Sequence, residues 1–301
     1  MNMLSHPVAN ESANVDKHWR ALFQGDFYAR ETKNGDCASL KTCMGKTQHY
    51  GPLRVQRPFY PEGNDLLHLY LLHPPGGLVG GDELSIDITA REGAKVLVTT
   101  PSAGKLYRNE TDMQQGQMIR IQVADNSAVE YLPQENIIFN GAKGTLNTLV
   151  ELKGNGLFIG WEITCLGRPE SQALFEDGCL KQSLLIYKDG KPLFLDRLNL
   201  NAQDGIMQSR AGLQNFSTFA SFVINREVSK PIYDKLIELQ QAFNQAGNNK
   251  FIAVTQKKDV LIVRALGHRA EPVKGMLEKM WEVIRPDVYG REMCIPRIWN
   301  T

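Results

Sequence analysis

The sequence lacks the features that mark several large classes of protein. Lys and Arg number 34 against 33 Asp and Glu, so the chain has no charge excess that would favour nucleic acid or an anionic membrane as a partner. No window is long and apolar enough to span a bilayer, and the first residues lack the charged start and apolar stretch of a secretory signal. We therefore expect a cytoplasmic protein that binds neither nucleic acid nor membrane.

Cysteine is scarce, and its spacing excludes two common kinds of site. The five cysteines are odd in number and form no CxxC pair. This pattern favours reduced thiols over a disulfide framework or a zinc site. The residues are Cys37, Cys43, Cys165, Cys179 and Cys294.

Motifs for nucleotide binding and for common catalytic centres are also missing. There is no GxSxG and no HExxH, and the six histidines show no ligand spacing. The glycine-rich stretch HPPGGLVGGD, residues 73–82, does not match GxGxxG or GxxxxGK(S/T), and it leads into the alternating ELSIDIT instead of a helix. Without a helix N-terminus to meet a phosphate, the stretch is typical of a turn between two strands.

The sequence does contain a long series of short strand patterns, beginning after about Asp16. Polar and apolar residues alternate in segments separated by glycine and proline turns, which predicts a mainly β fold. The segments are LSIDI (84–88), KVLVTT (95–100), MIRIQV (118–123), AVEYL (128–132), NTLVEL (147–152), LFIGWEITCL (157–166), SLLIYKDG (183–190) and PLFLDRLNL (192–200). Many are too uniformly apolar to face water on one side, so we expect layers of sheet that cover each other.

The pattern changes near residue 226. In SKPIYDKLIELQQAFNQAG, Ser229 fits a helix N-cap and Gly247 a helix stop. FIAVT (251–255) and DVLIVRAL (259–266) then predict a hairpin, and EPVKGMLEKMWEVI (271–284) predicts a second helix that ends at Pro286. We expect a flexible polar leader (1–16), a β-rich body (17–225) and an α+β portion carrying two helices (226–301), packed as one continuous domain.

Several carboxylates stand in apolar surroundings. Asp82 and Glu83 follow the glycines, Glu162 lies inside LFIGWEITCL, Asp196 inside PLFLDRL and Glu135 inside YLPQENIIF. An ionised carboxylate among buried strand residues costs free energy unless it is paired, hydrogen-bonded or exposed to water. Either arginines pair with these acids, or several acids line a wet internal passage, whose oxygen ligands would suit transient handling of a divalent cation.

Six motifs, taken together and in order, resemble one known family. They are RPFYPEG (57–63), HLYLLHPPGGLVGGDEL (68–84), TTPSAGKLYR (99–108), YLPQENIIFNGA (131–142), GWEITCLGRPES (160–171) and PRIWNT (296–301). This set is similar to the urease accessory protein UreD family, called UreH in some organisms.

The resemblance implies a non-catalytic maturation factor with a layered, β-helix-like fold and two helices. It implies a scaffold that binds the urease apoprotein and UreF, with the GTPase UreG docked on UreF. It also implies a water-filled tunnel through which nickel passes towards urease. The nucleotide would belong to UreG, and this chain would hold Ni²⁺ only transiently, without a tightly bound cofactor.

The resemblance also places the candidate site residues. Asp82, Glu162 and Asp196 are the candidates for acidic tunnel walls, and Glu83 and Glu135 are further candidates. HPPGGLVGGD then becomes a strand-to-strand turn that places Asp82 at the interior.

Strand geometry adds an expectation about the side chains beside Glu162. Because successive side chains of a strand point to opposite faces, Trp161 and Ile163 should point away from Glu162 into a packed core.

Two rival functions stay open at this point. One is a scaffold that opens the urease apoprotein without conducting nickel. The other is a β-helix carbohydrate-active enzyme that uses Asp82 and Glu162 as an acid and base pair, which requires the two carboxyls to share one cleft.

Overall fold

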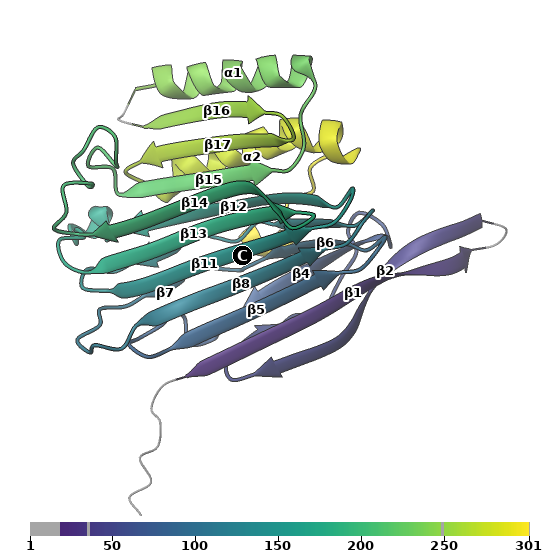
Figure 1. The fold of residues 1–301 in the computed structure, drawn as a ribbon, viewed down its shortest axis with the longest axis horizontal. Helices are drawn as coiled ribbons and strands as arrows, with labels where there is room; N and C mark the ends of the chain where they lie inside the picture. Colours follow the sequence, from purple (N-terminus) through teal and green to yellow (C-terminus); the bar gives the residue numbers. More distant parts are fainter. Residues whose placement is uncertain (1–18, 35–36, 248–249, 301) are drawn as a thin grey trace, which may run out of the picture.

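The computed structural model describes residues 19–34, 37–247 and 250–300, which form two stacked β-sheets and a layer of two helices (Figure 1). The seven-stranded sheet contains, in spatial order, β14 (Lys191–Asn201), β13 (Cys179–Lys188), β11 (Lys143–Leu152), β8 (Gln115–Val123), β5 (Glu83–Ala90), β1 (Arg20–Asn34) and β2 (Cys37–Tyr50). The expected leader, residues 1–16, lies outside the described residues.

The ten-stranded sheet lies behind the first one. Its order is β16 (Phe251–Lys257), β17 (Val260–Gly267), β15 (Thr218–Ile224), β12 (Leu157–Leu166), β9 (Ala128–Tyr131), β6 (Lys95–Thr99), β4 (Leu66–Leu72) and β3 (Arg54–Val55). Two short strands complete it: β10 (Asn136–Ile138) pairs with β12 and with β7 (Gly104–Leu106). Short 3₁₀ turns occur at Pro169–Ser171 and Arg297–Asn300.

The central part of the chain winds between the two sheets in successive coils. It passes from β4 to β5, then through β6 to β8, through β9 to β11, and through β12 to β13, and so alternates between the sheets. Neighbouring strands of these coils pair in parallel within each sheet. The predicted mainly β, layered and β-helix-like fold with two helices is confirmed.

The strands β1 and β2 differ from the short strands expected near the N-terminus. They are 15 and 14 residues long, and together they form an antiparallel hairpin that extends beyond the body as an arm (Figure 1). β1 also pairs in parallel with β5 through its first half, from Arg20 to Phe27. That pairing joins the arm to the seven-stranded sheet.

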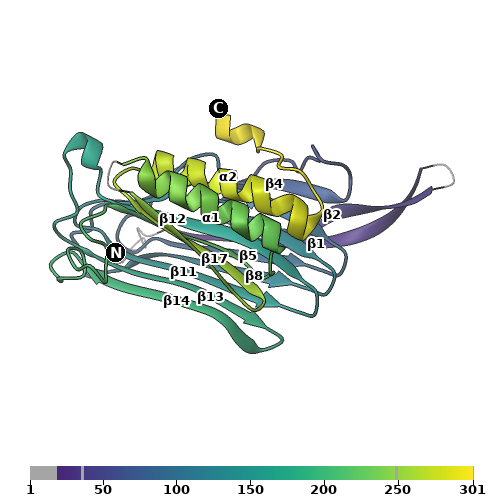
Figure 2. The same ribbon diagram turned by 90° about the horizontal axis from the view of Figure 1, so that it is seen from above.

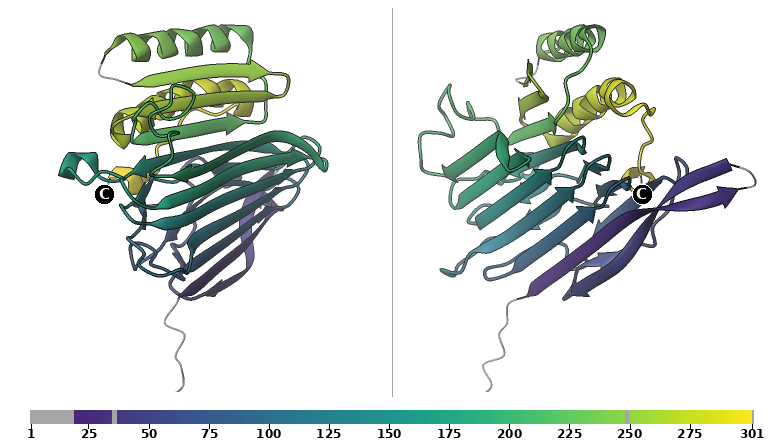
Figure 3. Two further views of the ribbon diagram at one scale, coloured as in Figure 1. Left: turned by 60° about the vertical axis from the view of Figure 1, so that its left-hand side comes forward. Right: turned by 45° about the vertical axis from the view of Figure 1, so that its right-hand side comes forward.

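Two hydrophobic cores hold the layers together. One fills the space between the sheets, and the other lies between the ten-stranded sheet and the helices α1 (Lys230–Gln245) and α2 (Ala270–Tyr289) (Figures 2 and 3). β12 separates the cores by alternation: Phe158 belongs to the first, and Trp161 and Ile163 belong to the second. The expectation that Trp161 and Ile163 point away from Glu162 is confirmed.

The helices begin as predicted, but the second one does not end as predicted. Ser229 occupies the N-cap of α1, although its hydroxyl donates to Asp287 of α2 at 2.7 Å instead of capping α1. α2 continues through Pro286 to Tyr289 and ends at Gly290, whose φ is 67°. Proline removes only one backbone bond, and in the last turn little helix remains to be lost.

The edge strand β16 is covered by side chains of α1. The amide of Asn244 bonds the backbone of Ile252 in both directions, accepting from N at 2.8 Å and donating to O at 3.0 Å. Gln240 accepts from the backbone N of Val254 at 2.7 Å. Three backbone groups that an edge strand usually leaves open, N and O of Ile252 and N of Val254, are therefore bonded.

The glycine-rich stretch connects β4 in one sheet with β5 in the other. Gly81 has φ of 89°, which favours glycine, and a Cβ on Gly77 would lie 2.4 Å from the ring of Tyr107. The stretch is thus a strand-to-strand turn whose glycines permit a tight bend and a close approach. Asp82 at its end is 6% exposed, as the sequence predicted.

The predicted boundary at residue 226 falls between β15 and α1. Strands on both sides of that boundary share one sheet, because β15 pairs with β12 on one side and with β17 on the other. The division into body and C-terminal portion stays a prediction.

Candidate functional site

A cavity of about 730 Å³ opens between the two sheets where β13 and β14 face β15, β17 and β16. We call it the wide cavity. Most of its wall is apolar, but polar and charged side chains project into it from both sheets. Those that carry the argument are Glu162, Gln182, Asp196, Ser221 and Arg264.

Strand register places three of these residues in one row. Glu162 of β12 is paired with Ser221 of β15, and Ser221 is paired with Arg264 of β17. Paired residues of neighbouring strands face the same side of a sheet. The row therefore points across the cavity at the seven-stranded sheet, which contributes Gln182 and Asp196.

Glu162 is half-buried and hydrogen-bonded through both oxygens. Thr148 of β11 donates to Oε1 at 2.5 Å, and Gln182 of β13 donates to Oε2 at 3.0 Å. Burial raises the pKa of Glu162, the two hydrogen bonds lower it, and the charge of Asp196 raises it, which gives a value of about 7. The surroundings thus disfavour a second negative charge beside Asp196 unless a cation accompanies it.

Asp196 is bonded from the ten-stranded sheet. Ser221 donates to its Oδ2 at 3.2 Å, and Nη2 of Arg264 lies 3.0 Å from the same oxygen. The Asp196 side chain is 25% exposed, and among the described residues none bonds its Oδ1. Asp196 and Glu162, predicted from sequence alone, are therefore brought into one cavity.

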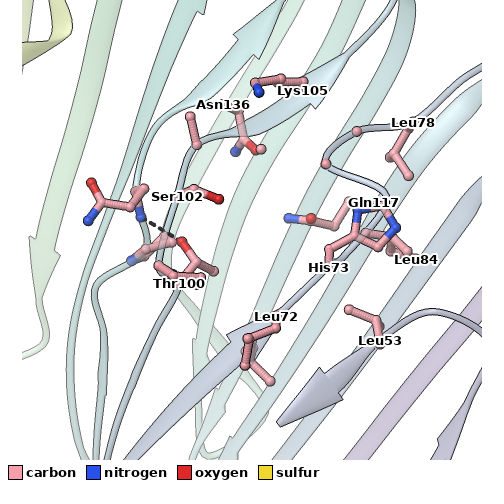
Figure 4. Close-up of a pocket in the computed structure, with 18 of the residues that line it drawn as sticks. Leu53, Leu72, His73, Leu78, Leu84, Thr100, Ser102, Lys105, Gln117 and Asn136 are labelled. Atoms are coloured by element: carbon pink, nitrogen blue, oxygen red, sulfur yellow. Dashed lines mark hydrogen bonds between the residues drawn. The ribbon is translucent and has the colours of Figure 1, made fainter. Parts of the chain in front are cut away.

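A second, smaller cavity of about 70 Å³ lies between the sheets beside the glycine-rich turn (Figure 4). We call it the small cavity. His73, Gln117 and Asn136 lie around it together with several leucines (Figure 4). Burial lowers the pKa of His73, which favours the neutral ring, and the charge of Asp82 offsets part of this effect. The volume suffices for about two water molecules.

Polar side chains lie between the small cavity and the wide cavity. Asn136 lines the small cavity and is paired in register with Thr164 of β12. Thr164 donates to Gln182 at 2.9 Å, and Gln182 donates to Glu162. Tyr131 lines the small cavity, and burial together with the charge of Glu162 raises its pKa. We call Asn136, Thr164, Gln182 and Glu162 the polar seam, because apolar core surrounds them.

Asp82, also predicted as a tunnel wall, lies apart from this pair. Its carboxylate accepts backbone N–H groups from Trp19 at 2.9 Å and from Val79 at 3.0 Å, which fixes the glycine-rich turn. It does not line the wide cavity, although its charge reaches His73 at the small cavity. Asp82 and Glu162 therefore do not share one cleft, which the proposed acid and base pair of a carbohydrate-active enzyme would require. The assignment of Asp82 to the passage stays a prediction.

The two further candidates lie elsewhere. Glu83 is exposed on the outer face of the seven-stranded sheet, 3.8 Å from Arg20. Glu135 is half-buried and lines a separate surface pocket of about 310 Å³ with Cys165 and His268. Neither lines the wide or the small cavity. Their roles stay predictions.

Sequence reasoning missed the partners that shape the site. Gln182 and Arg264 are polar residues at inward positions of strands whose other inward positions are apolar. Arg264, for example, stands between Ile262 and Leu266, which pack against the inter-sheet core. An arginine in phase with core residues was the available signal.

A closed ionic cluster, also missed, lies at the C-terminal end of α2. Arg285 is fully buried, and its guanidinium contacts Glu62 at 2.7 Å and Glu130 at 2.9 Å. Trp281 donates to Glu130 at 2.8 Å, and His68 lies 2.8 Å from Glu62. Burial opposes ionisation of Glu62, but the hydrogen bonds and charges of His68 and Arg285 outweigh it and lower its pKa.

Two kinds of feature are absent from the described ranges. No group of three or more His, Cys, Asp or Glu side chains there could hold a metal ion. No described helix has the length and apolar character needed to cross a membrane. The wide cavity therefore offers a cation two carboxylates and neutral oxygens instead of a closed ligand cage.

Comparison with known proteins gives a consistent result. Residues 33–300 match the family model described as UreD urease accessory protein. A urease accessory protein UreD of Saccharophagus degradans is 40% identical over 87% of this chain and 88% of its own length. Another, from Pseudoalteromonas translucida, is 38% identical over 100% of both chains. One from Hahella chejuensis is 39% identical over 95% of this chain and 91% of its own length. The chain belongs to the UreD family of urease accessory proteins.

Proposed function

We propose that this protein is a non-catalytic maturation factor that passes nickel between its two sheets to the urease apoprotein. Membership of the UreD family gives it a role in urease maturation. The proposal adds the route and the cargo. Ni²⁺ is the substrate of this transfer and is held only transiently.

The observation that carries the proposal is the polar seam and the acid pair at its end. The inter-sheet core is mostly apolar, yet polar side chains lie between the small cavity and the acids of the wide cavity, and hydrogen bonds join Thr164, Gln182 and Glu162. Buried polar groups cost free energy unless each is bonded, so such a series is expensive unless it serves a function. A passage for a hydrated cation needs such a series.

The ligand chemistry suits passage better than storage. Ni²⁺ accepts oxygen and nitrogen ligands, and two carboxylates with water bind it less tightly than a cage of cysteines and histidines. The charge of Asp196 and burial disfavour ionisation of Glu162, and an arriving cation would favour its ionised form. Loose serial binding lets the ion leave as readily as it enters. Asp82, through His73, would act at the small-cavity end of the same route.

The proposed setting is a cytoplasmic scaffold. The protein would bind UreF and the urease apoprotein, and UreG would dock through UreF and hold the nucleotide. The main rival is a scaffold with the same partners that opens the urease apoprotein without conducting nickel. Only the inward-facing acids distinguish the two functions.

The first experiment compares urease in cells that express it with its other accessory proteins, with and without this chain. Nickel per urease and activity should be low without the chain at matched urease levels. Fully loaded urease without the chain would contradict the maturation role here.

The second experiment tests the passage. Glu162→Ala, Asp196→Ala and Asp82→Ala, singly and together, should leave the assembly with partners intact while nickel per urease falls severalfold. Asp87→Ala is the matched control, because Asp87 belongs to the outer face, where it is bonded to Gln24 at 3.0 Å. Normal nickel loading by a folded triple variant would favour the rival scaffold.

A further inference from the structure

A single, half-exposed arginine pairs with the acids of the wide cavity among the described residues. Arg264 is 54% exposed, and its Nη2 lies 3.0 Å from Oδ2 of Asp196 across the gap between the sheets. Within the described residues, it is the only cation that forms an ion pair with either cavity acid. Its guanidinium also lies 6.0 Å from the ring centroid of Phe194.

Strand geometry makes this position unusual for an arginine. Arg264 shares its face of β17 with Ile262 and Leu266, both packed against the inter-sheet core. The chain therefore directs a cation into the cavity instead of presenting it on the outer surface. Because its side chain is half exposed and long, the guanidinium can leave Asp196 for solvent without any movement of the strands.

Asp196 keeps one oxygen available while Arg264 is bound. Ser221 and Arg264 both contact Oδ2, and among the described residues none bonds Oδ1. A divalent cation can therefore approach Oδ1 before Arg264 has left. Once the cation is there, it repels the guanidinium at short range, and the departure of Arg264 frees Oδ2 as well.

From these contacts we propose that Arg264 is an exchangeable counter-ion, which occupies Asp196 when the passage is empty, yields to Ni²⁺, and displaces the ion again as it leaves. This inference rests on the proposed nickel passage and adds how the ion is prevented from remaining. Without Arg264 the charge of Asp196 would be unbalanced, and the cavity would hold a divalent cation longer. The arginine thus sets residence time, whereas the carboxylates provide the binding.

The experiment measures Ni²⁺ retention by equilibrium dialysis of the purified full-length chain, alone and with its maturation partners. Arg264→Gln keeps hydrogen-bonding capacity and removes the charge, so we expect about tenfold tighter retention of Ni²⁺. Arg264→Lys keeps the charge and should stay near the wild type. The double variant Arg264→Gln with Asp196→Asn should lose the gain, because the freed carboxylate is then absent.

A matched control lies beside β1 and β5, several strands away from β13 and β14 in the seven-stranded sheet. Arg91 pairs with Asp26 at 2.7 Å, and its side chain is 65% exposed, so Arg91→Gln breaks a comparable ion pair away from the wide cavity. It should leave nickel retention unchanged. Thermal unfolding of each variant checks that the fold is intact. The counter-ion role is overturned if folded Arg264→Gln retains no more Ni²⁺ than the wild type. It is also overturned if neither protein retains Ni²⁺.

Failure of this inference can be told apart from failure of the passage. If Asp196→Ala lowers nickel in urease while folded Arg264→Gln retains no more Ni²⁺ than wild type, the passage stands and the counter-ion role is wrong. If the folded Glu162, Asp196 and Asp82 triple variant loads urease normally, the passage itself is wrong, and the counter-ion role fails with it.

Discussion

Two clusters in this protein each combine two carboxylates with one arginine, and their surroundings make them opposites. The guanidinium of Arg285 is fully buried and contacts both of its acids, Glu62 and Glu130. The guanidinium of Arg264 is half exposed and pairs with only one of the two, Asp196. The first arrangement is closed to any further ligand, whereas the second leaves one carboxylate oxygen, Oδ1 of Asp196, unbonded beside a cavity among the described residues.

The pKa shifts record the same contrast. In the closed cluster, hydrogen bonds and charges outweigh burial and lower the pKa of Glu62. In the wide cavity, burial and the charge of Asp196 outweigh the hydrogen bonds and raise the pKa of Glu162 to about 7. A carboxylate that is fully paired stabilises the fold, and one that lacks a cation is available to bind one.

The largest expected difference follows from removing each arginine. Arg285→Met removes the cation that contacts both buried acids, leaves only His68 beside Glu62, and should destabilise the protein by about 3–5 kcal/mol. Arg264→Met breaks a partly exposed pair and should cost about 1 kcal/mol or less. Denaturant unfolding of both variants measures the two values. Equal losses would remove the distinction between the clusters.

The pH dependence of stability gives a second, smaller contrast. The folded pKa of Glu162 is about 7 and its ordinary value 4.5, so as pH rises between these values the unfolded state loses this proton first and stability falls. Glu162→Gln removes that effect, so its stability relative to wild type should rise across this range, by about 3 kcal/mol at most. Unfolding at pH 5 and pH 8 compares the two proteins.

Glu62→Gln serves as the opposite case in that measurement. The lowered pKa of Glu62 means that its stabilisation is present above its unfolded value and is lost as pH falls through the folded value. The loss of folding stability caused by Glu62→Gln should therefore be larger at pH 8 than at low pH. For each variant, the stability relative to wild type is plotted against pH. If the two plots had slopes of the same sign, the two acids would share one kind of environment.

The smallest effect concerns single hydrogen bonds to each cluster. Ser221→Ala removes the 3.2 Å bond to Asp196 beside an open cavity and should cost about 0.5 kcal/mol. Trp281→Phe removes the 2.8 Å bond to fully buried Glu130 and should cost about 2 kcal/mol. Chemical denaturation resolves a difference of this size, and a larger loss for Ser221→Ala would reverse the comparison.

Much of the fold could be predicted because alternation and turn residues are local signals. The strand patterns around LSIDI and LFIGWEITCL overlap β5 and β12, and a glutamate inside an apolar strand indicated Glu162 as unusual. The end of α2 was missed because the rule that a proline stops a helix applies to helix interiors. Pro286 stands in the last turn, where one lost backbone bond costs little.

The site could be predicted only in part. Asp82, Glu162 and Asp196 all stand in unusual contexts, but a sequence does not reveal which acids share a cavity. That depends on register between strands far apart in the chain, such as the pairing of Glu162 with Ser221. The backbone donors of Trp19 and Val79 that satisfy Asp82 could not be inferred from local pattern either.

The side chains of Asn244 and Gln240 determine how the ten-stranded sheet ends. An edge strand normally offers its free backbone groups as a template on which an extended segment of another molecule can assemble. Here amide groups from a helix occupy that template along Ile252 and Val254, at the positions where a further strand would bond. Growth of the sheet by recruitment of another copy is therefore blocked along this stretch, which protects the protein from edge-to-edge aggregation.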